Sequence, residues 1–450
     1  MDKENTKKII TRFPPSPTGY LHVGSARTAL FNYIFAKQNG GEMLFRSEDT
    51  DKERSKQEFE DEILESLEWL GIKFDKTKII RQSERGEIYK RYLEKMIADG
   101  TAYISKEIVE KEGDRAEVIR FKNQNKGVIF TDTVRGEIKF DTTELGDFVI
   151  AKSLSEPLYH LAVVVDDYEM GVTHVIRGED GISNTPRQIL IQEAVGAPRP
   201  VYTHMPFSLA PDRSKLSKRH GAVSIREYRK MGYLPEAMVN YLMLLGWNPG
   251  TDQEIFTFDE LVAQFDINKI QKGGAIFDII KLNWVNTEHI KRMSENDFKT
   301  KVFEFLPEEI KKERGYSDFI VEKILPIIKE RISKFSEITE MYQAGEFGYY
   351  FNVPEYDKEK LVWKDADVNT TKAHLNRILE ILDEIDNFKS DLIKESLWNY
   401  ATEQGRGAVL WPMRFALSGK DKSPDPFTLA EVLGKPETVD RIKIALKKLN

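Results

Sequence analysis

The sequence contains no cysteine, which excludes disulfides, thiolate zinc sites and cysteine nucleophiles. Its 7 histidines are scattered, and none shows the paired helical spacing of a hydrolase zinc site. No apolar run approaches the length of a membrane span, and the charged N-terminus lacks the apolar core of a signal peptide. We therefore expect a cytoplasmic protein that does not associate with a membrane.

The chain also lacks an excess of positive charge. Lysine and arginine number 67 against 74 acidic residues, which gives a net charge of −7. This balance argues against binding nucleic acid through a general basic field, so any such partner must be met by local basic surface and by shape. The 450 residues, 40% of them hydrophobic, suffice for two to four domains.

The first hundred residues alternate between short apolar runs and amphipathic runs. The strand-like runs are 8–13 and 42–46, and the helix-like runs are Ala26–Asn39, Glu53–Leu70 and Glu84–Asp99. This alternation predicts a doubly wound parallel sheet.

Residues 101–158 change in character and predict a mixed α+β insertion that splits the sheet. The α/β pattern then resumes, and from about residue 220 the pattern is mostly helical. The strand-like runs of the insertion are Glu117–Phe121, Gly127–Phe130, Glu137–Phe140 and Asp147–Ile150. After it we expect strands at Leu161–Val165, Val172–Arg177 and Val201–His204 and a helix at Thr185–Ala194.

Two loops point to phosphate chemistry. Residues 15–25 join a strand to a helix through prolines and glycines, and His22 stands near the end of this loop. A strand, a glycine-containing turn and a helix N-terminus form a ready phosphate site. About 190 residues later, the segment Lys215–Arg219 is dense in cations. Together the loops indicate chemistry on a nucleotide.

Charged residues follow the predicted strands where each strand ends. Arg12, Arg46–Asp49 and Arg177–Asp180 occupy such positions, and a further strand ends at His204 just before the lysine loop. Ligands of open parallel sheets lie beyond the carboxyl ends of the strands. Taken singly, each group is more simply a surface ion pair or a polar loop. The joint order and placement favour a binding site.

These residues together resemble the glutamyl-tRNA synthetases, a family of class I aminoacyl-tRNA synthetases. The segment Arg12–Gly24 resembles the first family signature, and His22–Ser25 stands where class I enzymes carry a His-Ile-Gly-His motif. Lys215–Arg219 is similar to the second signature, of Lys-Met-Ser-Lys-Ser type. Further motifs in family order are Arg46–Asp51, Tyr159–Ala162, Val164–Asp167, Arg177–Asp180, Gly232–Ala237 and Leu245–Trp247. The resemblance is clear over residues 9–290 and weaker to the end.

The resemblance implies a fold, a reaction and partners. The implied activity joins L-glutamate to ATP as glutamyl-adenylate, with Mg²⁺, and then transfers glutamate to the 3′ end of tRNA(Glu). The implied enzyme is a monomer. Its Rossmann-type catalytic domain would span residues 1–100 and 159–219, with an acceptor-end-binding insertion at 101–158. A stem-contact domain at 220–293 and helical anticodon-binding domains at 294–450 would follow.

The resemblance also implies roles for individual residues. Arg12, Tyr159 and Arg177 would hold the side-chain carboxylate of glutamate, Glu48 its amino group, and Ser16 would help to seat it. His22, Lys215 and Lys218 would be catalytic. The implied ATP-binding residues are Thr18, His22, Gly24, Glu179, Asp180, Lys215, Leu216, Ser217, Lys218 and Arg219.

Several positions depart from the family pattern. Pro14 replaces a small residue, Ser47 stands where an aliphatic residue is common, and Gly181 stands where relatives often have histidine. The insertion is shorter than usual and lacks the cysteine cluster with which some bacterial members bind zinc. We therefore predict that the protein contains no zinc.

Alternative functions follow from the same motifs. The enzyme could be non-discriminating and also charge tRNA(Gln) with glutamate. A tRNA-modifying paralogue would be shorter than this chain, and a non-catalytic tRNA-binding protein would not need His22, Lys215 and Lys218. A nicotinamide dehydrogenase would need a Gly-x-Gly-x-x-Gly turn after the first strand. In the helical part, Arg406, Trp411 and Arg414 resemble an anticodon-reading segment, although Trp411 is equally compatible with a core position.

Overall fold

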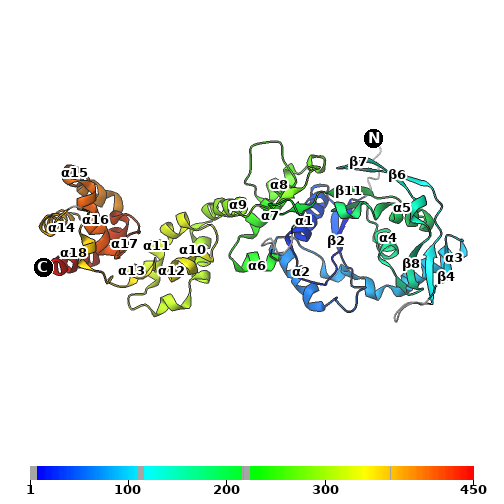
Figure 1. Ribbon diagram of the computed structural model, residues 1–450, viewed down its shortest axis with the longest axis horizontal. Coiled ribbons are helices and arrows are strands. Elements are labelled where there is room, and N and C mark those ends of the chain that lie inside the picture. Colours follow the sequence, from blue (N-terminus) through cyan, green and yellow to red (C-terminus); the bar gives the residue numbers. More distant parts are fainter. Residues whose placement is uncertain (1–7, 109–115, 215, 217–222, 365) are drawn as a thin grey trace. The chain divides into compact units, whose positions relative to one another are not determined.

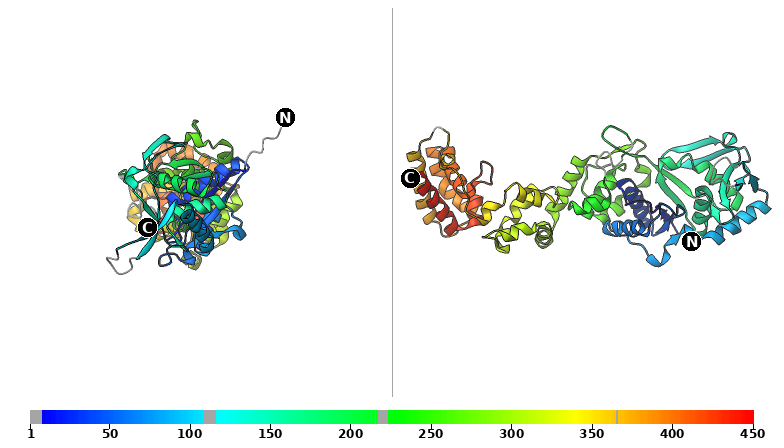
Figure 2. Two further views of the ribbon diagram at one scale, coloured as in Figure 1. Left: turned by 90° about the vertical axis from the view of Figure 1, so that its right-hand side faces the viewer. Right: turned by 60° about the horizontal axis from the view of Figure 1, so that its bottom comes forward.

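The structure, a computed structural model, describes residues 8–108, 116–214, 216, 223–364 and 366–450. The chain divides into two compact units, Met1–His289 and Ile290–Asn450. Figure 1 labels their elements. The N-terminal unit contains the sheets, and in the described residues the C-terminal unit is built from helices (Figure 2).

Two groups of strands form the central sheet of the N-terminal unit. One has the order β1-β2-β3 and is parallel, and the other has the order β10-β11-β6-β7, in which only β7 is antiparallel. The two groups meet where the N–H of Thr173 donates to the carbonyl of Ile10 at 2.9 Å. The strands are β1 (Ile10–Phe13), β2 (Glu42–Ser47), β3 (Ile80–Arg81), β6 (Gly127–Asp132), β7 (Gly136–Asp141), β10 (His174–Gly178) and β11 (Val201–Met205).

The insertion contributes to two sheets. Four of its strands form a separate antiparallel sheet, and β6 pairs with β11 of the central sheet, with Tyr202 opposite Asp132. The four strands are β4 (Ala102–Lys106), β5 (Glu117–Phe121), β8 (Phe148–Ser153) and β9 (Glu156–Pro157). The insertion therefore reaches the strands that carry the predicted site.

Helices cover the central sheet and bury its apolar side chains. In α1, Leu30, Phe31 and Ile34 are completely buried. The Asn32 amide nitrogen donates to the carbonyl of Ile176 on β10 at 2.9 Å. The helices of this unit are α1 (Val23–Gln38), α2 (Gln57–Trp69), α3 (Gly86–Ala98), α4 (Tyr159–Glu169), α5 (Thr185–Val195), α6 (Ile225–Lys230), α7 (Pro235–Leu244), α8 (Phe258–Gln264) and α9 (Ile279–Arg292, which runs past the unit boundary).

One predicted strand is wrong. Leu161–Val165 lies inside the helix α4 and is entirely buried. A helix buried on all its faces has no polar stripe, so a short apolar run cannot distinguish it from a buried strand. The helix predicted to start at Ala26 begins at Val23 instead, because His22 caps it.

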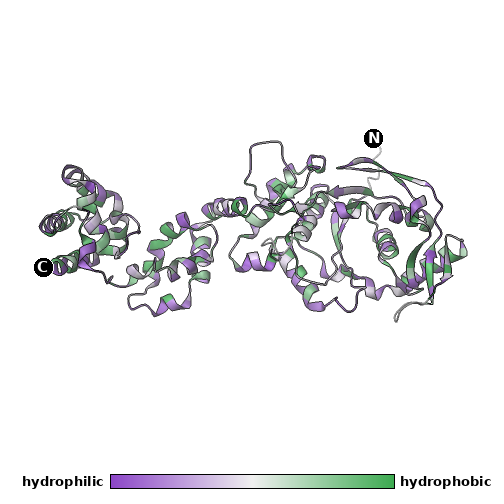
Figure 3. Ribbon diagram, in the orientation of Figure 1, coloured by the Kyte–Doolittle hydropathy of each residue, from purple (hydrophilic) through white to green (hydrophobic). Residues whose placement is uncertain are grey.

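The remaining elements are short strands and the helices of the C-terminal unit. Strands β12 (Ser208–Leu209) and β13 (Ala275–Ile276) pair in parallel. The helices, which show hydrophobic and hydrophilic residues in Figure 3, are α10 (Glu295–Phe305), α11 (Asp318–Arg331), α12 (Glu337–Gln343), α13 (Gly348–Phe351), α14 (Val368–Asp383), α15 (Ser390–Gln404), α16 (Arg406–Ser418), α17 (Pro426–Leu433) and α18 (Lys435–Leu449). Across the described ranges, none of the helices has the length and apolar character needed to cross a membrane.

Candidate active site

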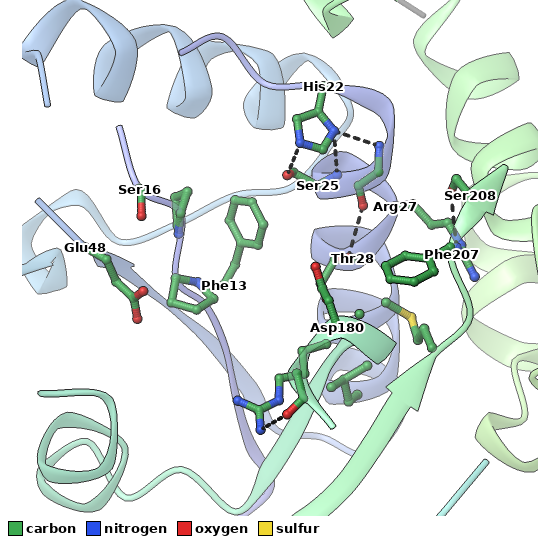
Figure 4. A pocket seen from close by; sticks show the side chains of 18 of the residues that line it. Phe13, Ser16, His22, Ser25, Arg27, Thr28, Glu48, Asp180, Phe207 and Ser208 are labelled. Carbon is green, nitrogen blue, oxygen red and sulfur yellow. Dashed lines mark hydrogen bonds between the residues drawn. The ribbon is translucent and has the colours of Figure 1, made fainter. Parts of the chain in front are cut away.

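A cleft of about 680 Å³ lies at the carboxyl edge of the central sheet. Its walls come from the end of β1, the following loop, the start of α1, the end of β10 and the segment after β11. Figure 4 shows Ser16 and Glu48 on one side of this cleft and Phe207 and Ser208 on the other. The predicted residues that line it are Arg12, Ser16, His22, Gly24, Glu48, Tyr159, Arg177, Asp180 and Leu216.

The loop before α1 is fixed by backbone hydrogen bonds. The carbonyl of Pro15 accepts from the N–H of Glu48 at 2.9 Å, and that of Pro17 accepts from Lys56 at 3.0 Å. The N–H of Leu21 donates to the buried carboxylate of Glu62 at 3.0 Å. These contacts hold the loop against β2 and α2, so the start of α1 has a defined position.

His22 is the N-cap of α1. Its Nδ1 accepts from the N–H groups of Gly24 at 3.1 Å and Ser25 at 3.3 Å, and its Nε2 lies 3.0 Å from the Ser25 hydroxyl (Figure 4). A Cβ at Gly24 would lie 3.2 Å from Cε1 of the His22 ring. The glycine therefore makes room for the imidazole over the helix N-terminus, where the helix dipole favours an anion.

The second predicted loop lies largely outside the described residues, because Lys215, Ser217, Lys218 and Arg219 are among those not described. Both sides of this loop are attached near the cleft. Leu216 lines the cleft, and its N–H donates to the carbonyl of Ser208 at 3.0 Å. On the other side, the N–H of Ile225 donates to the carbonyl of Leu21 at 2.8 Å, next to His22.

Arg12 and Arg46 share a buried carboxylate at one wall of the cleft. The Arg12 Nε lies 3.3 Å from both oxygens of Asp167, and the Arg46 Nη1 lies 2.6 Å from its Oδ1. Burial raises the pKa of Asp167, but the charges of Arg12 and Arg46 outweigh it and hold this pKa below its usual value. The Nη1 atom of Arg12 is buried and has no partner in the described part of the chain.

Arg177 supplies a second guanidinium to the cleft. Its Nε donates to Nε2 of His204 at 3.1 Å, and its Nη2 donates to Thr185 Oγ1 at 2.7 Å and to the carbonyl of Gly181 at 3.1 Å. Among the described residues, no carboxylate pairs with Arg177, and its Nη1 group has no hydrogen-bond partner. Burial and the nearby charge of Arg12 lower the pKa of Arg177. An anionic ligand would satisfy these unused donors.

Glu48 and Tyr159 complete this side of the cleft. The Glu48 carboxylate accepts from Nη2 of Arg46 at 2.9 Å, and its side chain is 10% exposed. Burial raises its pKa, against the opposing charges of Arg46 and Arg12. Burial and the neighbouring Glu48 raise the pKa of Tyr159, whose phenol therefore stays protonated at neutral pH.

Two predicted residues lie away from the cleft lining formed by the described residues. Thr18 is exposed, and its N–H donates to the carbonyl of Ser16 at 2.8 Å. The Glu179 carboxylate accepts from the N–H of Phe207 at 2.7 Å and from the Arg135 guanidinium at 2.5 Å. Of the two acids after β10, Asp180 is the one that lines the cleft.

Two buried groups behind Arg177 are not among the predicted site residues. Asp132 at the end of β6 accepts from Nδ1 of His204 at 2.7 Å, and both side chains are fully buried. The two residues are 72 positions apart, and only the pairing of β6 with β11 brings them together. A buried polar pair that touches a cleft arginine carries no local sequence signal.

The described residues contain no group of three or more histidine, cysteine, aspartate or glutamate side chains that could hold a metal ion.

In the C-terminal unit, the Trp411 indole N–H donates to the carbonyl of Lys360 at 2.8 Å, and its ring stacks on Phe415. Arg414 lies over Trp411 at 4.8 Å, and the exposed Arg406 lies over Trp398 at 4.4 Å.

Two family models match the chain. The model described as tRNA synthetases class I (E and Q), catalytic domain, matches residues 8–117 and 104–284. The model described as an anticodon binding domain matches residues 297–446. Together they cover most of both compact units.

Two glutamate–tRNA ligases and one solved structure are similar to the chain over nearly its full length. Glutamate–tRNA ligase 1 of Caldanaerobacter subterraneus subsp. tengcongensis is 38% identical over 477 residues, which span 98% of each chain. Glutamate–tRNA ligase of Aquifex aeolicus is 39% identical over 483 residues, covering 98% of this chain and 100% of the relative. The crystal structure of a glutamate tRNA ligase from Elizabethkingia meningosepticum in complex with its amino acid has a TM-score of 0.85 and 32% identity, covering 99% of this chain and 100% of that one.

Proposed function

The chain belongs to the glutamyl-tRNA synthetases among the class I aminoacyl-tRNA synthetases, and we propose that its cleft forms glutamyl-adenylate and passes the glutamyl group to tRNA(Glu). One observation carries this proposal: Arg12 and Arg177 have N–H donors at Nη1 that no described group accepts, and both line a cleft that also holds a helix N-terminus. The arginines suit a carboxylate, and the helix end suits a phosphate.

In the first step, a carboxylate oxygen of glutamate attacks the α-phosphorus of ATP. A new oxygen–phosphorus bond forms, the bond to the β-phosphate breaks, and pyrophosphate leaves. In the second step, a hydroxyl of the tRNA 3′ end attacks the adenylate carbonyl and AMP leaves. Neither step requires a covalent bond to the protein, so catalysis rests on alignment and on stabilising charge that builds on phosphate oxygens.

The glutamate would lie with its side-chain carboxylate against Arg12, Arg177 and the Tyr159 hydroxyl. The Glu48 carboxylate, beside Arg46, would accept from the amino group, and the exposed Ser16 would contact the amino acid from the loop. A neutral glutamine amide would leave the two guanidinium groups without a counter-charge. Discrimination between glutamate and glutamine is therefore electrostatic.

The nucleotide would lie along the start of α1. Gly24 and His22 would approach its phosphates, and Lys215 and Lys218 would approach from the loop that Leu216 and Ile225 attach beside the cleft. Thr18, Ser217 and Arg219 complete the proposed nucleotide set from the two loops. Asp180 is better placed than Glu179 to contact the ribose or adenine, because Asp180 lines the cleft and Glu179 is held by Arg135 and Phe207 away from that lining.

Mg²⁺ would reach this site bound to the ATP phosphates, where it would neutralise charge on the leaving pyrophosphate. Because the described residues offer no cluster of acidic and imidazole ligands, we assign no residue of this chain to the ion.

The further proposals are that the enzyme acts as a monomer and that the C-terminal unit reads the anticodon of the tRNA. The second rests on the match of residues 297–446 to the anticodon binding model.

Aminoacylation of purified tRNA tests the proposed function directly. The protein is supplied with radiolabelled glutamate, ATP and Mg²⁺, and with either tRNA(Glu) or tRNA(Gln). We expect charging of tRNA(Glu); the relatives' names do not favour the alternative, non-discriminating activity, which charging of both tRNAs would reveal. Failure to charge either tRNA would contradict the proposal. Glutamate-dependent exchange of pyrophosphate into ATP, with and without tRNA, separates activation from transfer.

Replacing His22 separates its capping role from its role toward phosphate. We expect His22→Ala to lower the rate of adenylate formation about 10²- to 10³-fold, the usual cost of removing one donor to a developing charge. Asparagine is a good N-cap, and it restores about 1 kcal/mol of helix stability without the second ring nitrogen. His22→Asn should therefore restore the unfolding temperature and leave pyrophosphate exchange impaired. Full recovery of exchange in His22→Asn would reduce His22 to a capping residue.

The absence of zinc is a separate prediction. Because the chain has no cysteine, a zinc site would have to be built from histidine and carboxylate groups alone. We expect mass-spectrometric metal analysis of the purified, active protein to find zinc well below one atom per chain. Treatment with a zinc chelator should leave aminoacylation in excess Mg²⁺ unchanged. Stoichiometric zinc, or loss of activity that added zinc restores, would contradict the prediction.

A further inference from the structure

We propose that Asp132 and His204 are positioning residues that fix the Arg177 guanidinium for recognition of the glutamate side chain. This inference rests on the proposed function and extends it to residues outside the cleft. It also gives the insertion a part in amino-acid selection, because Asp132 ends β6, a strand of the insertion. Strands β6, β11 and β10 are neighbours in this order in the sheet.

The hydrogen bonds of Asp132 fix the state of His204. Oδ1 of Asp132 accepts from the N–H groups of Val134 at 3.0 Å and Arg135 at 2.8 Å. Oδ2 accepts from the backbone N–H of His204 at 2.9 Å and faces its Nδ1 at 2.7 Å. A carboxylate with this set of contacts is an acceptor, so the proton of the imidazole sits on Nδ1.

With the proton on Nδ1, Nε2 of His204 is an acceptor, and it faces Nε of Arg177 at 3.1 Å. The Arg177 Nη2 group uses its hydrogens on Thr185 and on the carbonyl of Gly181. Three of the five N–H donors are thereby committed to the protein, and the Nη1 pair is left for a ligand. The guanidinium plane cannot turn without breaking these contacts.

Gly181 belongs to the same arrangement. A Cβ at this position would lie 2.4 Å from Nε of Arg177, so the guanidinium occupies space that any other residue would fill. The turn that follows Asp132 also holds the segment after Arg177, because the Arg135 guanidinium pairs with Glu179 at 2.5 Å. One turn of the insertion thus fixes both the arginine and the residues that follow it.

The test measures the KM of glutamate and of ATP separately, by pyrophosphate exchange in the presence of tRNA(Glu). His204→Leu removes the Nε2 acceptor and fills the same buried space with an apolar side chain. We therefore expect it to raise the KM of glutamate about 10- to 100-fold. The KM of ATP should change less than about 3-fold, because the proposed ligand of Arg177 is the glutamate side chain and not the nucleotide. His204→Gln, whose amide oxygen can take the place of Nε2, should recover most of the glutamate KM.

Asp132→Asn gives a second and independent variant. Its amide would donate to Nδ1 of His204 and move the imidazole proton to Nε2, so that two donors would face each other at Arg177. We expect the same selective rise in the glutamate KM. If His204→Leu does not fold, Asp132→Asn alone tests whether Asp132 and His204 position Arg177. An unchanged glutamate KM, or equal changes for glutamate and ATP, overturns the proposal.

His289 provides the matched control. It is also a buried histidine of the N-terminal unit, with Nε2 3.0 Å from Asn240 Oδ1, and it does not line the cleft formed by the described residues. His289→Leu should lower the unfolding temperature without a selective effect on glutamate. Failure of the wild-type protein to exchange pyrophosphate would instead overturn the proposed function. If the wild type exchanges pyrophosphate normally and His204→Leu has an unchanged KM of glutamate, only the positioning role is overturned.

Discussion

Arg177→Ala is expected to lower kcat/KM for glutamate by hundreds- to thousands-fold while the KM of ATP changes little. Truncating one partner of a partly desolvated charge pair costs about 3 to 5 kcal/mol, which corresponds to that range of rates. The fall should affect kcat/KM for glutamate and not the KM of ATP, because Arg177 lines the cleft beside Tyr159 and has no carboxylate partner among the described residues. Steady-state pyrophosphate exchange with each substrate varied in turn measures both effects.

Arg177→Lys is the matched variant, since it keeps the charge and loses the planar pair of donors. It should fall between wild type and Arg177→Ala in glutamate kcat/KM. The preference for glutamate over glutamine should shrink in Arg177→Ala, because a neutral amide no longer faces an uncompensated cation. Equal losses for glutamate and ATP would contradict the role of Arg177 in binding the side chain.

The placement of these residues at one sheet edge could be predicted because it depends on local patterns. Arg12 and Arg177 each stand one residue before the end of a short strand, and the carboxyl ends of parallel strands meet at one edge. That rule requires only that the strands be found and be parallel. The structure places both arginines in one cleft with Glu48 and Tyr159.

The errors have identifiable causes. The segment Leu161–Val165 is apolar at every position, and it belongs to a helix because α4 is covered on all sides at this level. The periodicity predicts a start of α1 three residues later than Val23, because N-caps are usually serine, threonine, aspartate or asparagine and here the cap is the ring nitrogen of His22. A histidine cap is visible only when its Nδ1 is seen to accept from the helix.

The contacts that hold the arginines could not be predicted from the sequence. Asp167 lies 155 residues from Arg12 and 121 from Arg46, and it meets both only after α4 packs beside β1 and β2. The motif Val164–Asp167 resembles the family pattern, but the sequence gives no physical reason for its two acids. In the structure, Asp166 accepts from Gln82, Arg85 and Tyr89 and lies 3.8 Å from Nε of Arg46, so the two neighbouring carboxylates share Arg46 and otherwise differ in their partners.

The Asp167 carboxylate is therefore expected to be a major determinant of the stability of the N-terminal unit. In Asp167→Asn, the buried Arg12, which is 2% exposed, loses its carboxylate partner, while the fully buried Arg46 keeps only the carboxylates of Glu48 and Asp166. Breaking a buried pair by removing one partner costs about 3 to 5 kcal/mol, because the remaining charge stays buried. We expect a large fall in the first unfolding transition of the full chain, and a weaker affinity for glutamate because Arg12 loses its support.

Glu169→Gln is the control, two residues further along the same helix. Its Oε1 pairs with the exposed Arg91 at 3.2 Å and accepts from the Tyr92 hydroxyl at 2.6 Å. A glutamine oxygen can still accept from Tyr92, and the lost exposed ion pair contributes about 0 to 1 kcal/mol. The difference in stability between the wild type and Asp167→Asn should depend on pH in a defined direction. Because the folded pKa of Asp167 lies below its ordinary value of 3.8, its stabilisation is complete above that pH and is lost only as the pH falls through the folded pKa. The wild type should thus keep its full advantage over Asp167→Asn from pH 8 to about pH 5. Equal unfolding transitions for Asp167→Asn and Glu169→Gln at neutral pH would show that Arg12 and Arg46 are held by other groups.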